Sequence, residues 1–343
     1  MYQREYFVPK ATGTLSDTLM AFGAAEVIGR LVRRHAPAAA VTLKDTGAYF
    51  VIDAGIPIAE AWLDDVAVRE DIPFVTASKF AVPDDLPMSL ARNVDDTWDQ
   101  FRRYHEQRKQ LSDQKVQTEE MKQALADLEM PADWSVVTYL GDYRMQAQGI
   151  HNGLVEQWQR SGKEFAALNM RTVLALFASP VADWAEIASQ WKRATKGSSF
   201  SDTVTASQLF NPDMGKGQNR AKANKLTMGN EKVFWLLEYL KAVGIWKACA
   251  PTKVTNADLR KTYVLSPIEL EMRYHDRVFA NFRDQLWNES AVKQDIVASL
   301  LYAQVLLQQL VEDDALDIFD EGPLSKLVSG MNVATYQLLS ANS

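Results

Sequence analysis

Cysteine and histidine are scarce in this sequence, which contains a single cysteine, Cys249, and four histidines. One cysteine excludes a disulfide framework and a cysteine-rich zinc site formed by this chain. The histidines are scattered along the sequence, at His35, His105, His151 and His275. The metal centres of most hydrolases need several such ligands brought together. We therefore predict no metal site and no bound cofactor.

Long apolar runs and an overall basic charge are also lacking. The sequence contains neither a run of about 18 apolar residues nor an apolar signal segment near its N-terminus. These absences predict a cytoplasmic protein without membrane contact. The net charge is −7 and the isoelectric point is about 5.3. Taken whole, the chain does not have the charge of a protein that coats nucleic acid.

What is present is an ordinary globular composition. Hydrophobic residues make up 47% of the chain and charged residues 24%, close to the average for folded proteins. A length of 343 residues suggests about two domains. Such a chain can bury a large core without disulfide or metal cross-links.

The charge is distributed unevenly along the chain. Residues 192–261 contain 13 Lys or Arg and 5 Asp or Glu, a local net charge of +8 in a chain whose total is −7. Basic side chains neutralise phosphates, and a local patch is sufficient for this. A basic segment in an acidic chain therefore indicates either a nucleic-acid contact or a solvated loop rich in lysine.

Apolar periodicity predicts most of the secondary structure. Helices are expected over residues 15–35, 95–129 (as a pair), 146–193 (two or three helices) and 231–243. Strands at 40–43 and 48–52, joined by the turn residues Asp45-Thr46-Gly47, form an expected hairpin. A further strand is expected at 261–265. The helix at 231–243 is expected to be capped by Asn230 and ended by Gly244.

From Pro267 onward, the pattern predicts helices to the end of the chain. Apolar residues with alternating spacings of four and three predict the packing seam of a bundle, formed by Ile296, Leu300, Ala303, Leu307 and Leu310. The expected fold is α+β and mostly helical. An N-terminal α/β domain over residues 1–265 would carry a small antiparallel sheet and the basic loop 192–230, and residues 266–343 would form a C-terminal helical bundle.

No catalytic motif is convincing. The glycine-rich Gly215-Lys216-Gly217 has Phe210 and Gly217 where a phosphate-binding loop needs glycine and Ser or Thr. The dipeptide His275-Asp276 matches part of the ligand set of metal-dependent phosphohydrolases, but no second ligand motif accompanies it. The sequence has no Gly-x-Ser-x-Gly nucleophile motif, and Cys249 is expected to be a buried, inert thiol. We therefore predict that the protein is not an enzyme.

The strongest local signal lies between Phe210 and Asn230. Lys, Arg, Asn and Gln, the side chains that hold phosphates and read base edges, alternate there with glycines that permit close backbone approach. Few apolar residues interrupt them. This composition favours a nucleic-acid contact over a surface loop without a ligand, and Lys192, Arg193 and Lys196 would extend the same surface.

The same segment carries a family resemblance. Residues 211–223, with the pattern Asn-Pro-x-x-Gly-Lys-Gly-x-Asn-Arg-x-Lys-Ala, resemble the middle of the large subunits of type I CRISPR effector (Cascade) complexes. The resemblance includes the run from Gly229-Asn230-Glu231-Lys232 to Gly244-Ile245-Trp246, with Lys261–Leu265 after it. It is strongest over residues 205–270. The opening helix and strand pair are similar to those of the smaller members of that group.

The resemblance implies a compact, non-catalytic subunit of an RNA-guided DNA-targeting complex. In that family an N-terminal α/β domain reads the protospacer-adjacent motif and holds the crRNA 5′ end, and a C-terminal helical bundle lies along the displaced strand. The implied partners are crRNA, target double-stranded DNA, the backbone and small subunits of the complex, and a recruited helicase-nuclease. Sequence specificity would come from guide pairing.

On this interpretation, two sets of residues contact DNA. The expected base or groove contacts are Asn211, Lys216, Gln218, Asn219 and Arg220. The expected phosphate contacts are Lys222, Lys225, Lys192, Arg193 and Lys196. Two alternatives stay open: an interaction or scaffold protein without nucleic-acid contact, using the polar helix 105–120 and the acidic segment 312–321, and a metal-dependent phosphohydrolase using His275-Asp276.

Overall fold

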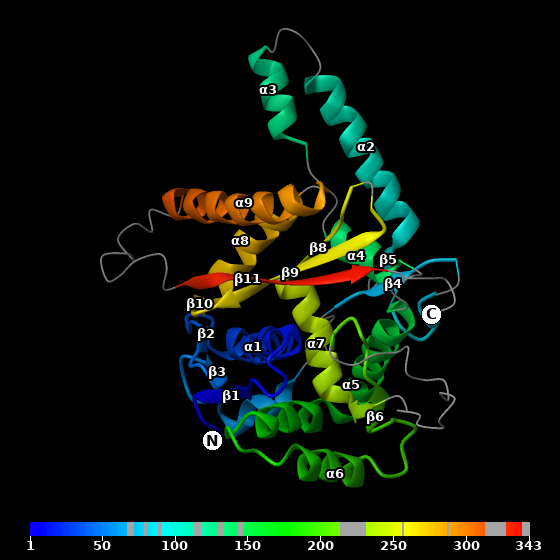
Figure 1. Cartoon of the computed structure of the whole chain (residues 1–343). Coiled ribbons are helices and arrows are strands. Elements are labelled where there is room, and N and C mark those ends of the chain that lie inside the picture. The colour runs from blue at the N-terminus through cyan, green and yellow to red at the C-terminus, as the bar shows by residue number, and fades with distance from the viewer. Residues whose placement is uncertain are drawn as a thin grey trace, which may run out of the picture.

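The fold is α+β and mostly helical, as the sequence predicts (Figure 1). The computed structural model describes residues 1–66, 72–78, 81–87, 91–112, 118–128, 133–142, 147–212, 231–255, 257–286, 288–312 and 327–337. Its helices are α1 (Leu15–His35), the short 3-10 helix η1 (Glu60–Asp65), α2 (Val94–Ser112), α3 (Glu119–Ala126), α4 (Trp134–Leu140), α5 (Gln148–Leu176), α6 (Trp184–Ala194), α7 (Trp235–Ala248), α8 (Met272–Gln285) and α9 (Ala291–Glu312). Within this part of the chain, no helix combines the length and apolar character that a bilayer crossing requires.

The strands form small sheets. They are β1 (Glu5–Pro9), β2 (Thr42–Asp45), β3 (Tyr49–Asp53), β4 (Phe74–Thr76), β5 (Ala91–Asn93), β6 (Thr203–Thr205), β7 (Lys232–Phe234), β8 (Cys249–Lys253), β9 (Leu259–Pro267), β10 (Glu269–Glu271) and β11 (Val328–Gln337). One antiparallel sheet has the order β1-β3-β2-β10, and a second has the order β11-β9-β8. The two-stranded pairs are β4–β5, which is parallel, and β6–β7. The predicted β2–β3 hairpin is confirmed.

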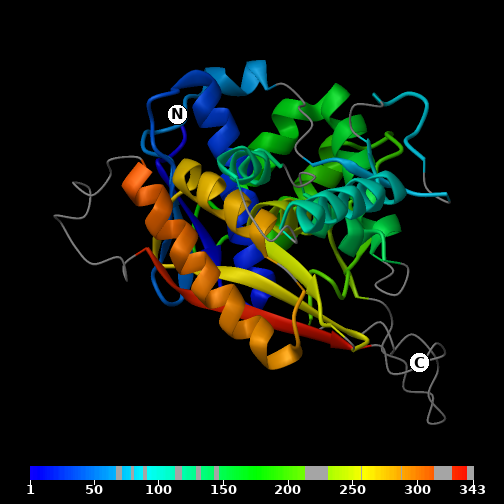
Figure 2. The same ribbon diagram turned by 90° about the horizontal axis from the view of Figure 1, so that it is seen from above.

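Two buried helices, α1 and α7, cross at the centre of the molecule (Figures 1 and 2). Every residue of α7 except Lys247 is buried, as expected of a helix that is apolar on all sides. The crossing depends on two glycines. A Cβ atom on Gly23 would lie 1.8 Å from the carbonyl oxygen of Leu240, and one on Gly244 would lie 2.0 Å from that of Leu19. The two backbones therefore touch where neither helix has a side chain.

The remaining helices cover this centre or extend from it. Helix α5 packs beside α7, and α6 packs on α5. Non-helical dihedrals at Phe165 mark a kink in α5. Helix α9 packs on α8, and Figure 2 shows it along the outer edge of the molecule. Helices α2 and α3, the predicted pair, extend away from the rest of the chain (Figure 1).

The predicted limits of α7 are wrong at both ends. Residues 232–234 form β7, which pairs with β6, so the helix begins at Trp235. Gly244 does not end the helix. It lies inside α7 because the contact with α1 leaves no room for a side chain.

The prediction of helix from Pro267 to the end is correct for α8 and α9 and wrong for two strands. β10 pairs with β2, and β11 pairs with β9. The predicted domain boundary at residue 265 falls inside β9, and one hydrophobic cluster includes buried residues from both sides of it. Strands far apart in the sequence thus tie the C-terminal part of the chain to the N-terminal sheet.

The predicted packing seam on α9 faces the wrong way. Ile296, Leu300, Ala303 and Leu307 are exposed, and among the seam residues only Leu310 is buried. The helix instead packs through another face, which includes Ala298, Tyr302, Val305 and Leu306.

Candidate functional site

Most of the residues expected to contact DNA cannot be placed. The following lie outside the described residues: Lys216, Gln218, Asn219, Arg220, Lys222 and Lys225. The other four, at positions 192, 193, 196 and 211, are described. Their positions differ sharply, because three are on the surface and one is in the core.

Asn211 is fully buried, so the prediction that it contacts a base is not supported by its position. Its side-chain oxygen accepts hydrogen bonds from Ser16 Oγ at 3.0 Å and from Lys241 Nζ. Its amide nitrogen donates to Glu238 Oε1 at 2.7 Å and to the carbonyl oxygen of Ser207 at 2.9 Å. Both ends of the amide are thus occupied by protein partners, and the residue joins α1 to α7 rather than facing a ligand.

Replacing Asn211 tests this structural role. Asn211→Ala leaves the buried Lys241 and Glu238 with fewer hydrogen bonds, so we expect it to lower the free energy of unfolding by about 2–4 kcal/mol. Urea denaturation followed by tryptophan fluorescence measures this change. If Asn211→Ala left the urea midpoint of unfolding unchanged but weakened DNA binding, Asn211 would be a DNA contact after all.

Lys192, Arg193 and Lys196 are exposed at the C-terminal end of α6, as a phosphate-contacting surface requires. Two of them have acidic neighbours. Lys192 Nζ lies 3.0 Å from Asp202 Oδ2, and an Arg193 guanidinium nitrogen lies 2.7 Å from Glu186 Oε1. Both are surface ion pairs, which contribute little energy and exchange readily with other anions.

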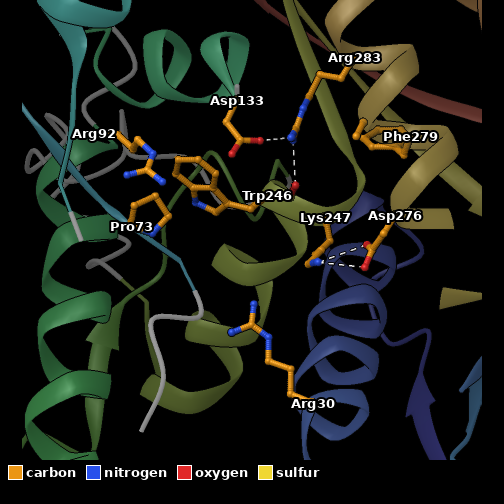
Figure 3. A pocket seen from close by; sticks show the side chains of 10 residues that line it. Arg30, Pro73, Arg92, Asp133, Trp246, Lys247, Asp276, Phe279 and Arg283 are labelled. Carbon is orange, nitrogen blue, oxygen red and sulfur yellow. Dashed lines mark hydrogen bonds and ion pairs between the residues drawn. The ribbon is translucent and has the colours of Figure 1, made fainter. Parts of the chain in front are cut away.

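A second basic feature is a pocket of about 340 Å³ between α1, β5, α7 and α8 (Figure 3). Its lining residues are Arg30, Pro73, Arg92, Asp133, Trp246, Lys247, Asp276, Phe279, Ala280 and Arg283. Four of these side chains are cationic, two are carboxylates, and two are aromatic. The lining therefore combines positive charge with flat apolar surface.

Lys247 lies at the centre of the charges on one side of the pocket. As the one residue of α7 that is not buried, it reaches out of the core near the end of the helix. Its Nζ is 3.2 Å from both carboxylate oxygens of Asp276 and 3.4 Å from Glu26 Oε1. Glu26 also pairs with Arg30 at 2.5 Å. Burial alone would raise the pKa of Glu26, but the surrounding cations lower it, so this carboxylate is charged and holds two of the pocket cations in place.

Arg283 forms the opposite wall. One guanidinium nitrogen donates to the carbonyl oxygen of Trp246 at 2.8 Å, and the other donates to Asp133. Arg283 and Trp246 are both more than nine-tenths buried. The Nε of Arg283 and the indole Nε1 of Trp246 are nevertheless buried, and neither has a hydrogen-bond partner among the described residues. Unsatisfied buried donors are rare and costly, but both nitrogens are shielded from solvent, so neither is open to a ligand in the pocket as it stands.

Arg92, on β5, is the least engaged cation of the pocket. Its side chain is exposed, and the hydrogen bond described for it goes to the carbonyl oxygen of the neighbouring Ala91, at 3.0 Å. Figure 3 shows its guanidinium near Pro73 and Trp246. A guanidinium that is not held by a carboxylate can bind a phosphate in two-pronged geometry. Arg92 therefore gives the pocket a group that suits a phosphate.

The sequence did not reveal this pocket. Its four cations lie at positions 30, 92, 247 and 283, on elements that only the folded chain brings together. Lys247 alone belongs to the basic segment 192–261.

The two residues named by the phosphohydrolase alternative both have protein partners. His275 is buried, and its Nε2 donates to the carbonyl oxygen of Lys247 at 2.8 Å. Asp276 is paired with Lys247. The described part of the chain contains no group of three or more His, Cys, Asp or Glu side chains placed to hold a metal ion. Cys249 is buried as expected, and burial raises the pKa of its thiol far above the usual value.

Comparisons with known proteins do not assign this chain to a family. No protein-family model matches the chain, and no curated protein matches its sequence. The functional argument therefore depends on the residues, the pocket and the resemblance over residues 205–270.

Proposed function

We propose that this chain is a non-catalytic, nucleic-acid-binding large subunit of a type I CRISPR DNA-targeting complex that acts in the cytoplasm. The observation that supports this most directly is the cationic, aromatic pocket. Its cations match the phosphates of a nucleic acid. The resemblance supports the same conclusion, because the matching run Gly244–Trp246 contributes Trp246 to the pocket wall.

In this proposal, the chain contributes positioning rather than chemistry. Arg92, Arg30 and Lys247 would hold backbone phosphates, and the cations at the end of α6 would extend the contact. Guide RNA pairing would supply sequence specificity, while the protein reads the short adjacent motif on duplex DNA. Its partners would be crRNA, target DNA, the backbone and small subunits, and a recruited helicase-nuclease.

Replacing Arg92 tests the pocket directly. Because Arg92 is exposed and, among the described residues, bonds to the backbone of its neighbour Ala91, Arg92→Ala should leave the fold intact. Losing one phosphate contact should weaken binding of a fluorescent duplex or single strand by about tenfold. It should also reduce the slope of the logarithm of the binding constant against the logarithm of the salt concentration by about one. Fluorescence anisotropy at salt concentrations between about 50 and 200 mM measures both quantities.

The matched control is Arg102→Ala. Arg102 is an exposed arginine on α2, paired with Asp99 and outside the pocket lining. It should not change binding. Equal binding by wild type and Arg92→Ala would remove the pocket from the proposal, and no binding by wild type at low salt would favour the scaffold alternative.

Purification from the native host tests the assembly. A tagged chain should co-purify with several proteins and with short RNAs that carry repeat-derived ends. A chain that is recovered alone, without RNA, would contradict the proposal.

A further inference from the structure

Helix α9 exposes a continuous apolar stripe. Its members are Val292, Ile296, Leu300, Ala303, Leu307 and Val311. The five larger side chains are between 48% and 76% exposed. At 3.6 residues per turn, all six fall within an arc of about 100° over five turns of the helix. Single exposed apolar residues are common, but a contiguous row marks an interaction surface.

This stripe is not the face that packs α9 onto the protein. That face consists of other residues, among them Tyr302, Val305 and Leu310, which are buried. Helix α9 also runs along the outer edge of the molecule in Figure 2, where a second molecule can approach it. Within the described residues, the stripe has no covering element.

The spacing of the stripe is symmetric. Its successive intervals are four, four, three, four and four residues, and they are the same in both directions. Two such helices placed antiparallel match side chain to side chain. Val292 meets Val311 of the other copy, Ile296 meets Leu307, and Leu300 meets Ala303. A two-fold interface requires such self-complementarity, because each contact occurs twice.

The charges near the stripe do not oppose this arrangement. Lys293, near its N-terminal end, pairs with Glu289 of the same chain at 2.9 Å. Glu312, at the C-terminal end, lies about 150° around the helix from the middle of the stripe, so it does not face the partner helix. The exposed polar residues between them, Ser299, Gln304 and Gln308, are uncharged, so they add no repulsion. Antiparallel helix dipoles also attract.

We propose that α9 is a docking surface for a second copy of this chain, paired antiparallel about a two-fold axis between residues 301 and 302. This proposal does not depend on the nucleic-acid function, because it involves a different face and a different partner. One helix pair is a small interface, so the association should be weak, with a dissociation constant on the order of micromolar.

Leu300→Lys tests the surface. The change places a charge in each copy at the centre of the interface, so it acts twice in the dimer. Sedimentation equilibrium of the full chain should show a concentration-dependent dimer for wild type. The dissociation constant of Leu300→Lys should be at least about tenfold higher. Its melting temperature, measured at a concentration well below the wild-type dissociation constant, should be unchanged, because Leu300 is exposed in the single chain.

The matched control is Val181→Glu, which adds a charge at another exposed apolar residue, in the turn between α5 and α6. It should dimerise as wild type does. A wild-type chain that is monomeric throughout would overturn the proposal, as would a dimer that Leu300→Lys leaves intact. A lower melting temperature for Leu300→Lys at that low concentration would also overturn it, because another part of the same chain would then cover the stripe.

Cysteine cross-linking tests the orientation. In the antiparallel pair, Ile296→Cys in one chain lies opposite Leu307→Cys in another, but two Ile296→Cys positions lie about 16 Å apart along the helix. Since disulfides need Cα atoms within about 7 Å, mixed chains should cross-link and Ile296→Cys alone should not. The native Cys249 is buried and should not interfere. Cross-linking of Ile296→Cys to itself would contradict the antiparallel arrangement.

Discussion

Gly244→Ala is expected to lower the free energy of unfolding by about 3 kcal/mol, a large share of the roughly 5–15 kcal/mol that typically stabilises a folded protein. The added Cβ would lie 2.0 Å from the carbonyl oxygen and 2.6 Å from the carbonyl carbon of Leu19. These are backbone atoms of α1, so no side-chain rotation relieves the clash. The two central helices must separate, and the core around them loses its packing. Gly23→Ala should have the same effect from the other side of the crossing, where the distance is 1.8 Å to Leu240.

Gly153→Ala is the matched control. Gly153 lies in the interior of α5, and a Cβ there meets no atom within 4 Å. Because alanine favours the helix over glycine, this change should stabilise the protein by up to about 1 kcal/mol. Urea denaturation followed by circular dichroism measures all three variants. If Gly244→Ala and Gly153→Ala were equally stable, the close crossing of α1 and α7 would be wrong.

Acid is expected to destabilise the protein through two buried histidines. Burial lowers the pKa of both His151 and His275 to about 4, from the usual 6.5. Between those values the unfolded chain binds protons that the folded chain does not, so the free energy of unfolding falls as the pH falls from about 6.5 to 4. For each histidine, a pKa shift of this size lowers the free energy of unfolding by about 3 kcal/mol once the pH has fallen to about 4.

The surroundings of His275 explain the direction of its shift. Its ring lies against Phe22 and Phe279, with centroids 4.7 and 5.1 Å away. Its Nδ1 is buried without a partner that a second proton could use. Asp276 favours the protonated ring, whereas Lys247 and Arg283 oppose it. Burial dominates, and the ring stays neutral in the folded chain.

Asp284 acts in the opposite direction over the same range, so a variant is needed to isolate the histidine contribution. Burial raises the pKa of Asp284 to about 6, which makes the folded chain bind a proton there earlier than the unfolded one does. His275→Phe keeps an aromatic ring between Phe22 and Phe279 and removes one titrating group. Its free energy of unfolding should fall less steeply between pH 6.5 and 4.5 than that of wild type. Parallel curves would show that His275 does not contribute to acid sensitivity.

Local patterns in the sequence were sufficient for several elements. The amphipathic run at 15–35 predicted α1 with the correct limits, and the turn at Asp45–Gly47 predicted the hairpin β2–β3. In both cases the information lies within about twenty neighbouring residues, because helix periodicity and turn residues act over short distances.

Elements that depend on distant partners were missed. The strand β11 pairs with β9, about seventy residues earlier, and β10 pairs with β2 from the start of the chain. The stripe on α9 was predicted to be core because its spacing is that of a packing seam. Spacing identifies an apolar face, but it does not identify what covers that face.

The sequence by itself determined the α+β class, the main helices, the hairpin and the basic segment within an acidic chain, because these follow from the local order and composition of residues. Only the tertiary structure decided that Gly244 serves a helix crossing, that Asn211 is buried between α1 and α7, and that four cations from distant positions line one pocket. Each of these depends on the approach of segments separated by many residues. Local propensity carries no information about which distant segments will meet, whereas packing of the core around α1 and α7 specifies it.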